Sequence, residues 1–323
     1  VDCITALFSA DHKANGVSDH DIIIYVKATY EATENWIANA GACLLGGSYH
    51  KNRPVVGRIM YNTKYLSMVP DALEGNIDTT MHEASHIFAF SGGLYSSYVD
   101  AKGNKLGLAK VVNDGKIITP AVIKTAREHF GCDSIDGVLL ENNGGGGSAG
   151  SHWERVILHN EAMTASAFRN GVFTNFTFSI FADSGWYKMN YQFAQPLFWG
   201  KGAGCDFYNN TCDSTAPVAK KYFCNDSSIG CTYDKAGWGP CSGDSFADSC
   251  KYYSAYSNRV CLDTSSGPAG FSITRDYYGG DSKCFVSSMI NKGYTTSIPV
   301  RCHKYKCNKS GGVDVFFSDN ESV

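Results

Sequence analysis

The pattern His82-Glu83-Ala84-Ser85-His86 is the feature that most restricts how this chain can fold. It lies within residues 72–90, a segment whose composition favours a helix. Two histidines four residues apart lie on one face of a helix, so both imidazoles can reach the same metal ion. Two neutral nitrogen ligands that leave coordination positions open suit catalytic zinc, and the intervening glutamate can act on water bound to it. On this pattern alone, a helix with two surface or core histidines is the alternative.

The cysteines are unevenly distributed along the chain. Of the 13 cysteines in 323 residues, ten lie between residues 205 and 307. No C-x-x-C pair occurs, so disulfides in an oxidising compartment explain them better than zinc fingers or iron–sulfur clusters. The odd count leaves at least one thiol free or paired outside this chain. Five sequons for N-glycans agree with secretion: Asn175, Asn209, Asn225, Asn308 and Asn320. We therefore expect a secreted protein, or one on the extracellular face of the cell surface.

Charge and hydropathy exclude two classes of partner. The net charge is −3, from 28 basic and 31 acidic residues, and no basic run stands out, so nucleic acid is not an expected partner. No apolar run approaches the roughly 18 residues that span a bilayer. We therefore expect membrane association only through parts outside this chain. The first residues do not resemble a signal peptide and include no initiator methionine, which indicates a processed chain or a fragment.

Local patterns predict a mixed set of helices and strands. Residues 21–27 and 53–61 are apolar and β-branched and read as strands, the second as an edge strand because Pro54 stands near its start. Residues 119–130 and 176–187 read as helices. Residues 29–40 stay unassigned. The helix that carries the histidines is capped near Asp71, or at Asp78 if it is shorter.

A glycine-rich stretch, residues 142–151, precedes His152. Such a stretch is either a flexible linker or a loop that threads tightly beside an active site. After Gly204 the composition shifts to cysteine, serine, tyrosine and glycine. We therefore place a domain boundary near Cys205, followed by a loop-rich part held by disulfides.

Two common arrangements of the third metal ligand do not fit. In one class of H-E-x-x-H peptidases the third ligand is a glutamate on the next helix, but the first glutamate after His86 is Glu128. In metzincins the pattern continues as H-E-x-x-H-x-x-G-x-x-H above a methionine turn. Here Ala89 takes the place of the glycine and Gly92 that of the third histidine. The compact metzincin pattern is therefore broken.

The chain resembles the leishmanolysin family, peptidase family M8, a metzincin branch whose third histidine follows an inserted segment. The family pattern H-E-x-x-H-x-x-G-F-S-G corresponds here to residues 82–92, which read HEASHIFAFSG. The family's G-S-x-G-S-H, followed by an acidic residue, x and M, corresponds to residues 147–152, GSAGSH, and 161–163, EAM. Segments at 53–57, 195–200, 204–205 and 224–227 continue the similarity over nearly the whole chain.

This resemblance implies a metal centre with one zinc ion per chain. It implies His82, His86 and His152 as zinc ligands, Glu83 as general base on a zinc-bound water, and Met163 as the methionine turn. His159 is the nearest rival to His152, but it lacks the glycine-rich approach. The resemblance also implies two disulfides, Cys3–Cys43 and Cys132–Cys205.

Two departures from the family pattern affect these expectations. Ala89 replaces a glycine at a sharp turn, where a left-handed alanine would cost about 1 kcal/mol unless the turn differs. The strand and long helix that normally open the family's catalytic domain would precede Val1.

The resulting expectation is an α+β fold with a metzincin-like catalytic domain split by an insertion and a disulfide-rich loop and β domain at the C-terminus. Residues 1–100 would carry the active-site helix, 101–204 the third ligand and the methionine turn, and 205–323 the cysteine-rich domain. The expected function is zinc-dependent hydrolysis of peptide bonds in extracellular or surface proteins, with polypeptide substrates. The alternative is a non-catalytic surface adhesion or structural protein that retains the fold. A carbohydrate-binding or interaction role for 205–323 fits either.

Overall fold

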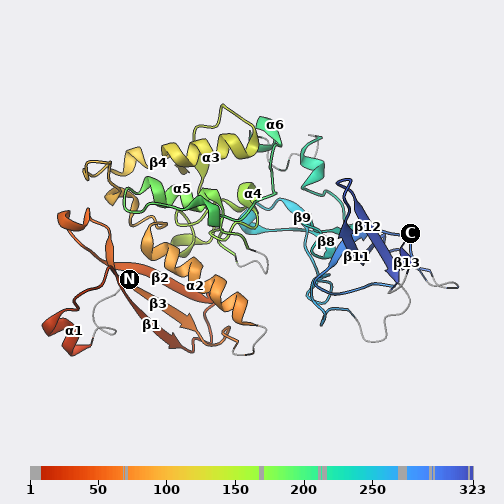
Figure 1. Ribbon diagram of the computed structural model, residues 1–323, viewed down its shortest axis with the longest axis horizontal. Coiled ribbons are helices and arrows are strands. Elements are labelled where there is room, and N and C mark those ends of the chain that lie inside the picture. Colours follow the sequence, from red (N-terminus) through yellow and green to blue (C-terminus); the bar gives the residue numbers. More distant parts are fainter. Residues whose placement is uncertain are drawn as a thin grey trace. The chain divides into compact units, whose positions relative to one another are not determined.

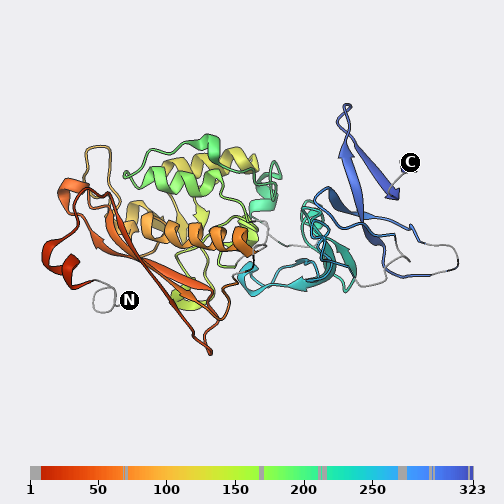
Figure 2. The ribbon, with the colours of Figure 1, turned by 60° about the horizontal axis from the view of Figure 1, so that its bottom comes forward.

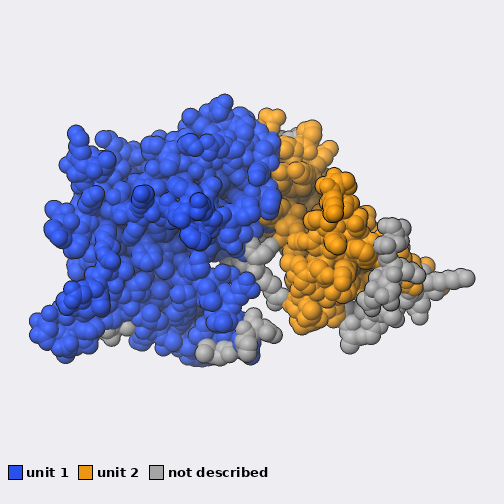
Figure 3. Space-filling model, viewed as in Figure 1, with its two compact units in different colours: residues 1–205 blue, residues 206–323 orange. Residues whose placement is uncertain are grey.

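The structure is a computed structural model that describes residues 9–67, 69, 72–166, 171–209, 212, 217–267, 275–290, 293, 295–318 and 321–322. It is a mixed α+β protein built from several small sheets, and the chain falls into two compact units, Val1–Cys205 and Asp206–Val323 (Figure 3). Among the described residues, no helix is both long and apolar enough to cross a membrane.

Unit 1 contains the longer helices and two small sheets (Figure 1). Its helices are α1 (Ala10–Asn15), α2 (Leu73–Phe88), α3 (Pro120–Phe130), α4 (Arg155–Leu158), α5 (Asn175–Asp183) and α6 (Gly204–Asn209), the last of which spans the unit boundary. Its strands are β1 (Ile23–Thr29), β2 (Ala38–Leu45), β3 (Pro54–Asn62), β4 (Val112–Asn113), β5 (Lys116–Ile117) and β6 (Val138–Leu139).

The first sheet has the strand order β1-β3-β2, in which β1 runs parallel and β2 antiparallel to β3. The strands expected at residues 21–27 and 53–61 are thus confirmed as β1 and β3. The expectation that 53–61 forms an edge strand is wrong, because β3 is paired on both sides. Pro54 is tolerated there because it is the first residue of β3, opposite Leu45 at the end of the ladder. Strand β2 falls partly in the segment that the sequence left unassigned.

Helix α2 packs against β2 and β3 of this sheet (Figures 1 and 2). The close approach depends on Gly57 in β3, since a Cβ atom there would lie 2.3 Å from Cγ2 of Ile87. Ile87 is fully buried. The helix that carries the histidine motif therefore packs so closely on the sheet that residue 57 has room for glycine and for no larger side chain.

The predicted helices are confirmed, with small differences at their ends. Helix α2 begins at Leu73, so the shorter helix capped by Asp78 does not form, and Asp71 lies outside the described residues. Ala89 ends α2 with φ −155° and therefore avoids the left-handed conformation. The helix expected over 176–187 ends at Asp183, shortly before Gly185, which takes a positive φ of 76°.

Helices α3 and α5 lie side by side in unit 1 (Figure 1). Phe130 of α3 and Phe176 of α5 are buried, with ring centroids 6.0 Å apart. The last residue of α5, Asp183, accepts hydrogen bonds from the backbone N–H groups of Ala121 and Val122, which lack partners within the first turn of α3. The start of α5 is in turn hydrogen-bonded to Glu161, in the segment that carries Met163.

Unit 2 is made of short strands. They are β7 (Ile229–Cys231), β8 (Trp238–Gly243), β9 (Lys251–Tyr253), β10 (Ser282–Val286), β11 (Val300–Cys307), β12 (Val313–Ser318) and β13 (Glu321–Ser322). They form a three-stranded sheet, β7-β8-β9, and a four-stranded sheet, β10-β11-β12-β13. Half-cystines fill much of its buried core, where Cys231 bonds Cys284 and Cys261 bonds Cys302.

Five disulfides join described residues. They are Cys132–Cys205, Cys212–Cys250, Cys224–Cys241, Cys231–Cys284 and Cys261–Cys302. The first is the bond that the family resemblance implies. The other implied bond, Cys3–Cys43, involves Cys3, which lies outside the described residues. Among the described residues, Cys307 is an exposed free thiol. So many disulfides are typical of extracellular proteins.

Candidate metal centre

Three histidines converge in unit 1 although the third stands 66 positions after the second in the sequence. His82 and His86 stand one turn apart on α2, and His152 follows the glycine-rich loop. The Nε2 atom of His82 lies 3.1 Å from the Nε2 atoms of both other histidines. Among the described residues, these three form the group of His, Cys, Asp or Glu side chains that could hold a metal ion.

Each imidazole is oriented by a hydrogen bond from its other nitrogen. The Nδ1–H groups of His82, His86 and His152 donate to the backbone carbonyls of Ala162 (2.7 Å), Phe90 (2.7 Å) and Ser148 (2.9 Å). A proton on Nδ1 leaves the Nε2 atom with a free lone pair. The three carbonyls therefore select the tautomer in which every Nε2 atom can bind a metal.

The electrostatics of the three rings favour a cation between them. Burial lowers the pKa of all three histidines, that of His152 to about 3, so the rings are neutral at pH 7. Neutral rings whose Nδ1 atoms are protonated direct three lone pairs at one another. Zinc bound tetrahedrally by imidazoles at 2.0–2.1 Å would hold the nitrogens about 3.3 Å apart. The Nε2 separations of 3.1 Å fit this requirement, so the residues present suit zinc.

Glu83 lies beside the histidines on α2 and is buried. Its Oε2 atom has no hydrogen-bond partner among the described residues. Burial raises the pKa of Glu83 to about 8, and the positive charge of Arg58 opposes this shift. An orphaned carboxylate oxygen of this kind can accept a proton or a hydrogen bond from a small molecule at the site.

Arg58 is a residue of this site that sequence reasoning missed. Its guanidinium is buried and donates to Oδ1 of Asn39 at 2.9 Å. Its positive charge lowers the pKa of Glu83, against the larger effect of burial. A signal was present in the sequence, since a charged side chain within the otherwise apolar strand at 53–61 needs a partner.

Met163 is fully buried in the turn that follows Glu161. The backbone N–H of Trp153 donates to the carbonyl of Met163 at 2.9 Å, which ties this turn to the residue after His152. The structure thus brings Met163 close in the fold to the segment of His152. His159 is not part of the group: it is buried, stacks on Trp199 with ring centroids 4.1 Å apart, and takes a positive φ of 41°.

The glycine-rich stretch is a structured loop beside the histidines. Gly144, Gly145 and Gly150 take positive φ values of 77°, 64° and 75°. The backbone N–H of Gly150 donates to the carbonyl of Glu141 at 2.8 Å, and Ser148 supplies the carbonyl that orients His152. Of the two alternatives raised by the sequence, the tightly threaded loop is the one observed.

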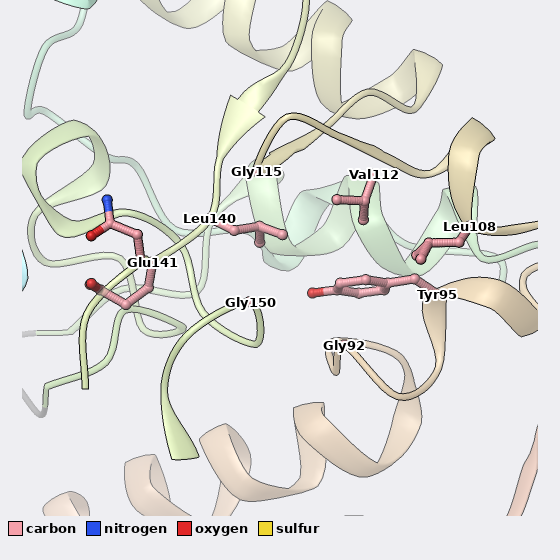
Figure 4. A pocket seen from close by; sticks show the side chains of 9 residues that line it. Gly92, Tyr95, Leu108, Val112, Gly115, Leu140, Glu141 and Gly150 are labelled. Carbon is pink, nitrogen blue, oxygen red and sulfur yellow. The ribbon is translucent and has the colours of Figure 1, made fainter. Parts of the chain in front are cut away.

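A pocket of about 320 Å³ lies behind this loop, and none of the three histidines lines it. Its walls include the apolar side chains of Leu108, Val112 and Leu140. Figure 4 shows the Tyr95 hydroxyl directed toward the space between Leu140 and Gly150. The pocket is mainly apolar and does not include the Nε2 atoms of the three histidines, so it is not a second metal centre.

Comparison with known proteins supports the resemblance seen in the motifs. A family model described as leishmanolysin matches residues 3–244. The chain belongs to the leishmanolysin family of metallopeptidases. It is 33% identical over 238 residues to a leishmanolysin-like peptidase of Drosophila pseudoobscura pseudoobscura, which covers 61% of this chain and 34% of that protein. It is 30% identical over 313 residues to a ciliated left-right organizer metallopeptidase of Xenopus laevis, which covers 90% of this chain and 42% of that protein.

A third member of the leishmanolysin family, a leishmanolysin-like peptidase of Caenorhabditis elegans, is 32% identical over 258 residues, 66% of this chain and 38% of its own length. The chain thus spans about a third to two fifths of these relatives. Family membership together with the three converging histidines, two buried and one half-buried, gives a metallopeptidase framework with a group that could hold zinc.

Proposed function

We propose that this chain is a zinc endopeptidase in which His82, His86 and His152 hold the metal and Glu83 is the general base. The observation that carries the proposal is the convergence of three Nε2 lone pairs beside an orphaned, buried carboxylate oxygen. A structural zinc site would need no such base. Family membership supports the choice of zinc and of peptide bonds.

When bound, zinc lowers the pKa of a coordinated water and polarises the scissile carbonyl. Glu83 takes the proton from the attacking water and delivers it to the nitrogen of the leaving amine. The charge of Arg58 favours the ionised form of Glu83, as a dication held by the adjacent imidazoles would. Burial has the opposite effect and helps the carboxyl hold the proton until it passes to the nitrogen of the leaving amine.

Strand β2 is our candidate for the position of an extended substrate. It is an edge of the three-stranded sheet as far as the described residues go, and α2 packs against it. A substrate could extend the sheet by backbone hydrogen bonds along this edge. Strand β3 cannot take this role, because β1 and β2 occupy both of its sides. Substrate peptides with N-methylated backbone amides should then show a lower kcat/KM, and an unchanged kcat/KM would exclude strand addition.

We further propose that the catalytic part is metzincin-like, with residues 1–100 bearing α2, residues 101–204 bearing His152 and the Met163 turn, and 205–323 forming the cysteine-rich domain. The protein would act outside the cell, on extracellular or surface polypeptides. N-glycans fit best at Asn175, Asn209 and Asn225, which are exposed. The Asn308 side chain is engaged with Asp314 and Gly312, and Asn320 lies outside the described residues.

The test is cleavage of an unfolded protein substrate by the purified chain, with and without a zinc chelator, alongside Glu83→Gln. We expect one zinc per chain in both proteins, cleavage that the chelator abolishes, and no cleavage by the variant. Turnover by Glu83→Gln would refute the role of the carboxylate. A wild-type chain that holds one zinc and cleaves nothing would favour the non-catalytic adhesion or structural role instead.

A further inference from the structure

The side chain of Glu161 is a second buried carboxylate, and it lies outside the histidine motif. It has no exposed surface, and its oxygens accept four hydrogen bonds. Oε2 accepts from the backbone N–H of Met163 at 2.6 Å. Oε1 accepts from the N–H of Thr174 (3.1 Å), the hydroxyl of Thr174 (3.1 Å) and the hydroxyl of Thr177 (2.7 Å). Every contact is a donor, so the site is built for a carboxylate acceptor.

The position of Glu161 joins two segments that are distant in the sequence. Its Oε1 atom lies at the N-terminus of α5, where Thr174 is the cap residue and where a negative charge is favourable. Its Oε2 atom closes a turn around Ala162 by binding the N–H of Met163. The carboxylate therefore fixes the backbone between residues 161 and 163 to the first turn of α5.

This turn presents the acceptor for the first histidine of the motif. The carbonyl of Ala162 accepts the hydrogen bond from Nδ1 of His82 at 2.7 Å. Since Ala162 stands between the carboxylate and the N–H that it binds, rotation of the 161–163 backbone would carry this carbonyl away from His82. Loss of the bond would release the tautomer and the orientation that point Nε2 toward the other two rings.

The same network reaches the third histidine by another route. The hydroxyl of Thr177, which donates to Glu161, accepts a hydrogen bond from Nε1 of Trp153 at 3.0 Å. Trp153 is fully buried, directly follows His152, and donates its backbone N–H to the carbonyl of Met163. Glu161 thus lies between the backbone segments that orient His82 and His152.

We propose that Glu161 is a positioning residue for the metal centre: its carboxylate holds the Met163 turn so that His82 and His152 present their Nε2 atoms to zinc. The inference rests on the proposed function, because it assigns Glu161 a role toward the same metal. Glu161 touches neither substrate nor metal, so its effect reaches the centre only through Ala162, Met163 and Trp153.

Glu161→Gln is the decisive variant, since it keeps the size of the side chain but replaces one acceptor oxygen with an NH₂ group. In either orientation that group meets a donor, the N–H of Met163 or the Thr174 and Thr177 donors. The matched control is Asp183→Asn. Asp183 is a partly buried carboxylate at the other end of the same helix, and its backbone hydrogen bonds go to α3, which carries none of the three histidines.

The full chain is titrated with zinc against a chromophoric chelator at pH 8, and the absorption spectrum of the cobalt-substituted protein is recorded. We expect Glu161→Gln to weaken zinc binding by about 10- to 100-fold and to change the cobalt spectrum. Excess zinc should restore part of its peptidase activity. Asp183→Asn should leave both the zinc affinity and the spectrum as in the wild type. If Glu161→Gln fails to fold, Thr177→Val carries the test, because it removes one donor and the link to Trp153 and should weaken zinc binding less.

An unchanged zinc affinity and cobalt spectrum in a folded Glu161→Gln protein would overturn the inference, even if that protein were as destabilised as Asp183→Asn. Failure of the proposed function would look different: the wild-type chain itself would bind no zinc, or would bind zinc and cleave no substrate. The two failures are therefore separate, since one is seen in the variant and the other in the wild type.

Discussion

Substitution of Gly57 by alanine tests whether the seating of α2 on the sheet controls the metal centre. A methyl group at this position would lie 2.3 Å from Cγ2 of Ile87, 2.9 Å from Cδ1 and 3.1 Å from Cγ1. Carbon atoms in contact sit about 3.5 Å apart or more, so strand and helix would have to separate by roughly 1.2 Å. Ile87 is fully buried and has little room to rotate away. Such overpacking costs about 1–3 kcal/mol in the free energy of unfolding.

The same displacement should affect catalysis more strongly than stability. His82, Glu83 and His86 belong to α2 and would move with it. A misplacement of about 1 Å in a catalytic group can cost on the order of 100-fold in rate. We expect Gly57→Ala to lower kcat/KM by that order, measured at saturating zinc on an unfolded protein substrate. Urea unfolding followed by circular dichroism gives the change in stability on the same preparation.

A double-mutant cycle with Ile87→Ala makes the argument specific. Ile87→Ala alone should cost about 2–5 kcal/mol, because it leaves a cavity. Together with Gly57→Ala it removes the clashing atoms, so the double mutant should be more stable than the sum of the single effects by at least about 1 kcal/mol. The matched control is Gly75→Ala, which lies on α2 with no atom near the new methyl group and should be neutral or slightly stabilising. Additive effects in the cycle, or full activity of Gly57→Ala, would refute the reasoning.

Three further outcomes follow from the structure. Replacing both Cys132 and Cys205 with alanine should lower the free energy of unfolding by up to about 4 kcal/mol, because their bond closes a loop of 73 residues; a loss near zero in urea unfolding would contradict this. Burial raises the pKa of Glu161 to about 7, because it outweighs the opposite effect of the four hydrogen-bond donors; the unfolded chain therefore releases this proton at a lower pH than the folded chain, and stability falls between about pH 4.5 and 7. Across that window the chelated wild type should lose about 3 kcal/mol relative to Glu161→Gln, whereas parallel pH profiles would exclude the shift. Alkylation of the native protein should label Cys307, and peptide mapping that found label on any of the ten cysteines in the five described disulfides would contradict this set.

The sequence predicted those parts of the fold that carry a strong local pattern. Helix α2 was evident because the motif lies in a continuous helical stretch, and β3 because residues 53–61 are apolar and β-branched. Strand β2 was missed because Ala38, Gly41 and Ala42 have small side chains with no preference for strands. Its pairing is decided by β3 and by α2, which are contacts that no local pattern encodes.

The edge position assigned to residues 53–61 failed for a related reason. A proline excludes a residue from the interior of a ladder, but Pro54 stands at the first position of β3 and leaves the rest of the strand free to pair on both sides. A single proline therefore indicates where a strand begins, but it does not indicate how many strands pair with it.

The side chains of the candidate site could be predicted from the sequence, but the residues that orient them could not. His82, Glu83 and His86 follow from the H-E-x-x-H motif, and the resemblance to the leishmanolysin family implies His152 and Met163. Arg58 reaches Glu83 only because β3 runs beneath α2, and Glu161 meets Thr174 and Thr177 only because its turn packs on the start of α5. Such partners depend on tertiary contacts between segments that are separate in the sequence.

The use of main-chain carbonyls to orient all three imidazoles has a consequence for mutational studies. The acceptors belong to Ala162, Phe90 and Ser148, and no replacement of these side chains deletes a carbonyl group. An alanine scan would therefore not report on these oxygens: residue 162 is already alanine, Ser148→Ala keeps its carbonyl, and a loss at Phe90 would reflect its fully buried ring, which packs on Trp153. Substitutions that change the path of the backbone would instead disturb these carbonyls. A map of mutational effects would therefore reveal the residues that hold the backbone in place and would not reveal the carbonyl groups that orient the histidines.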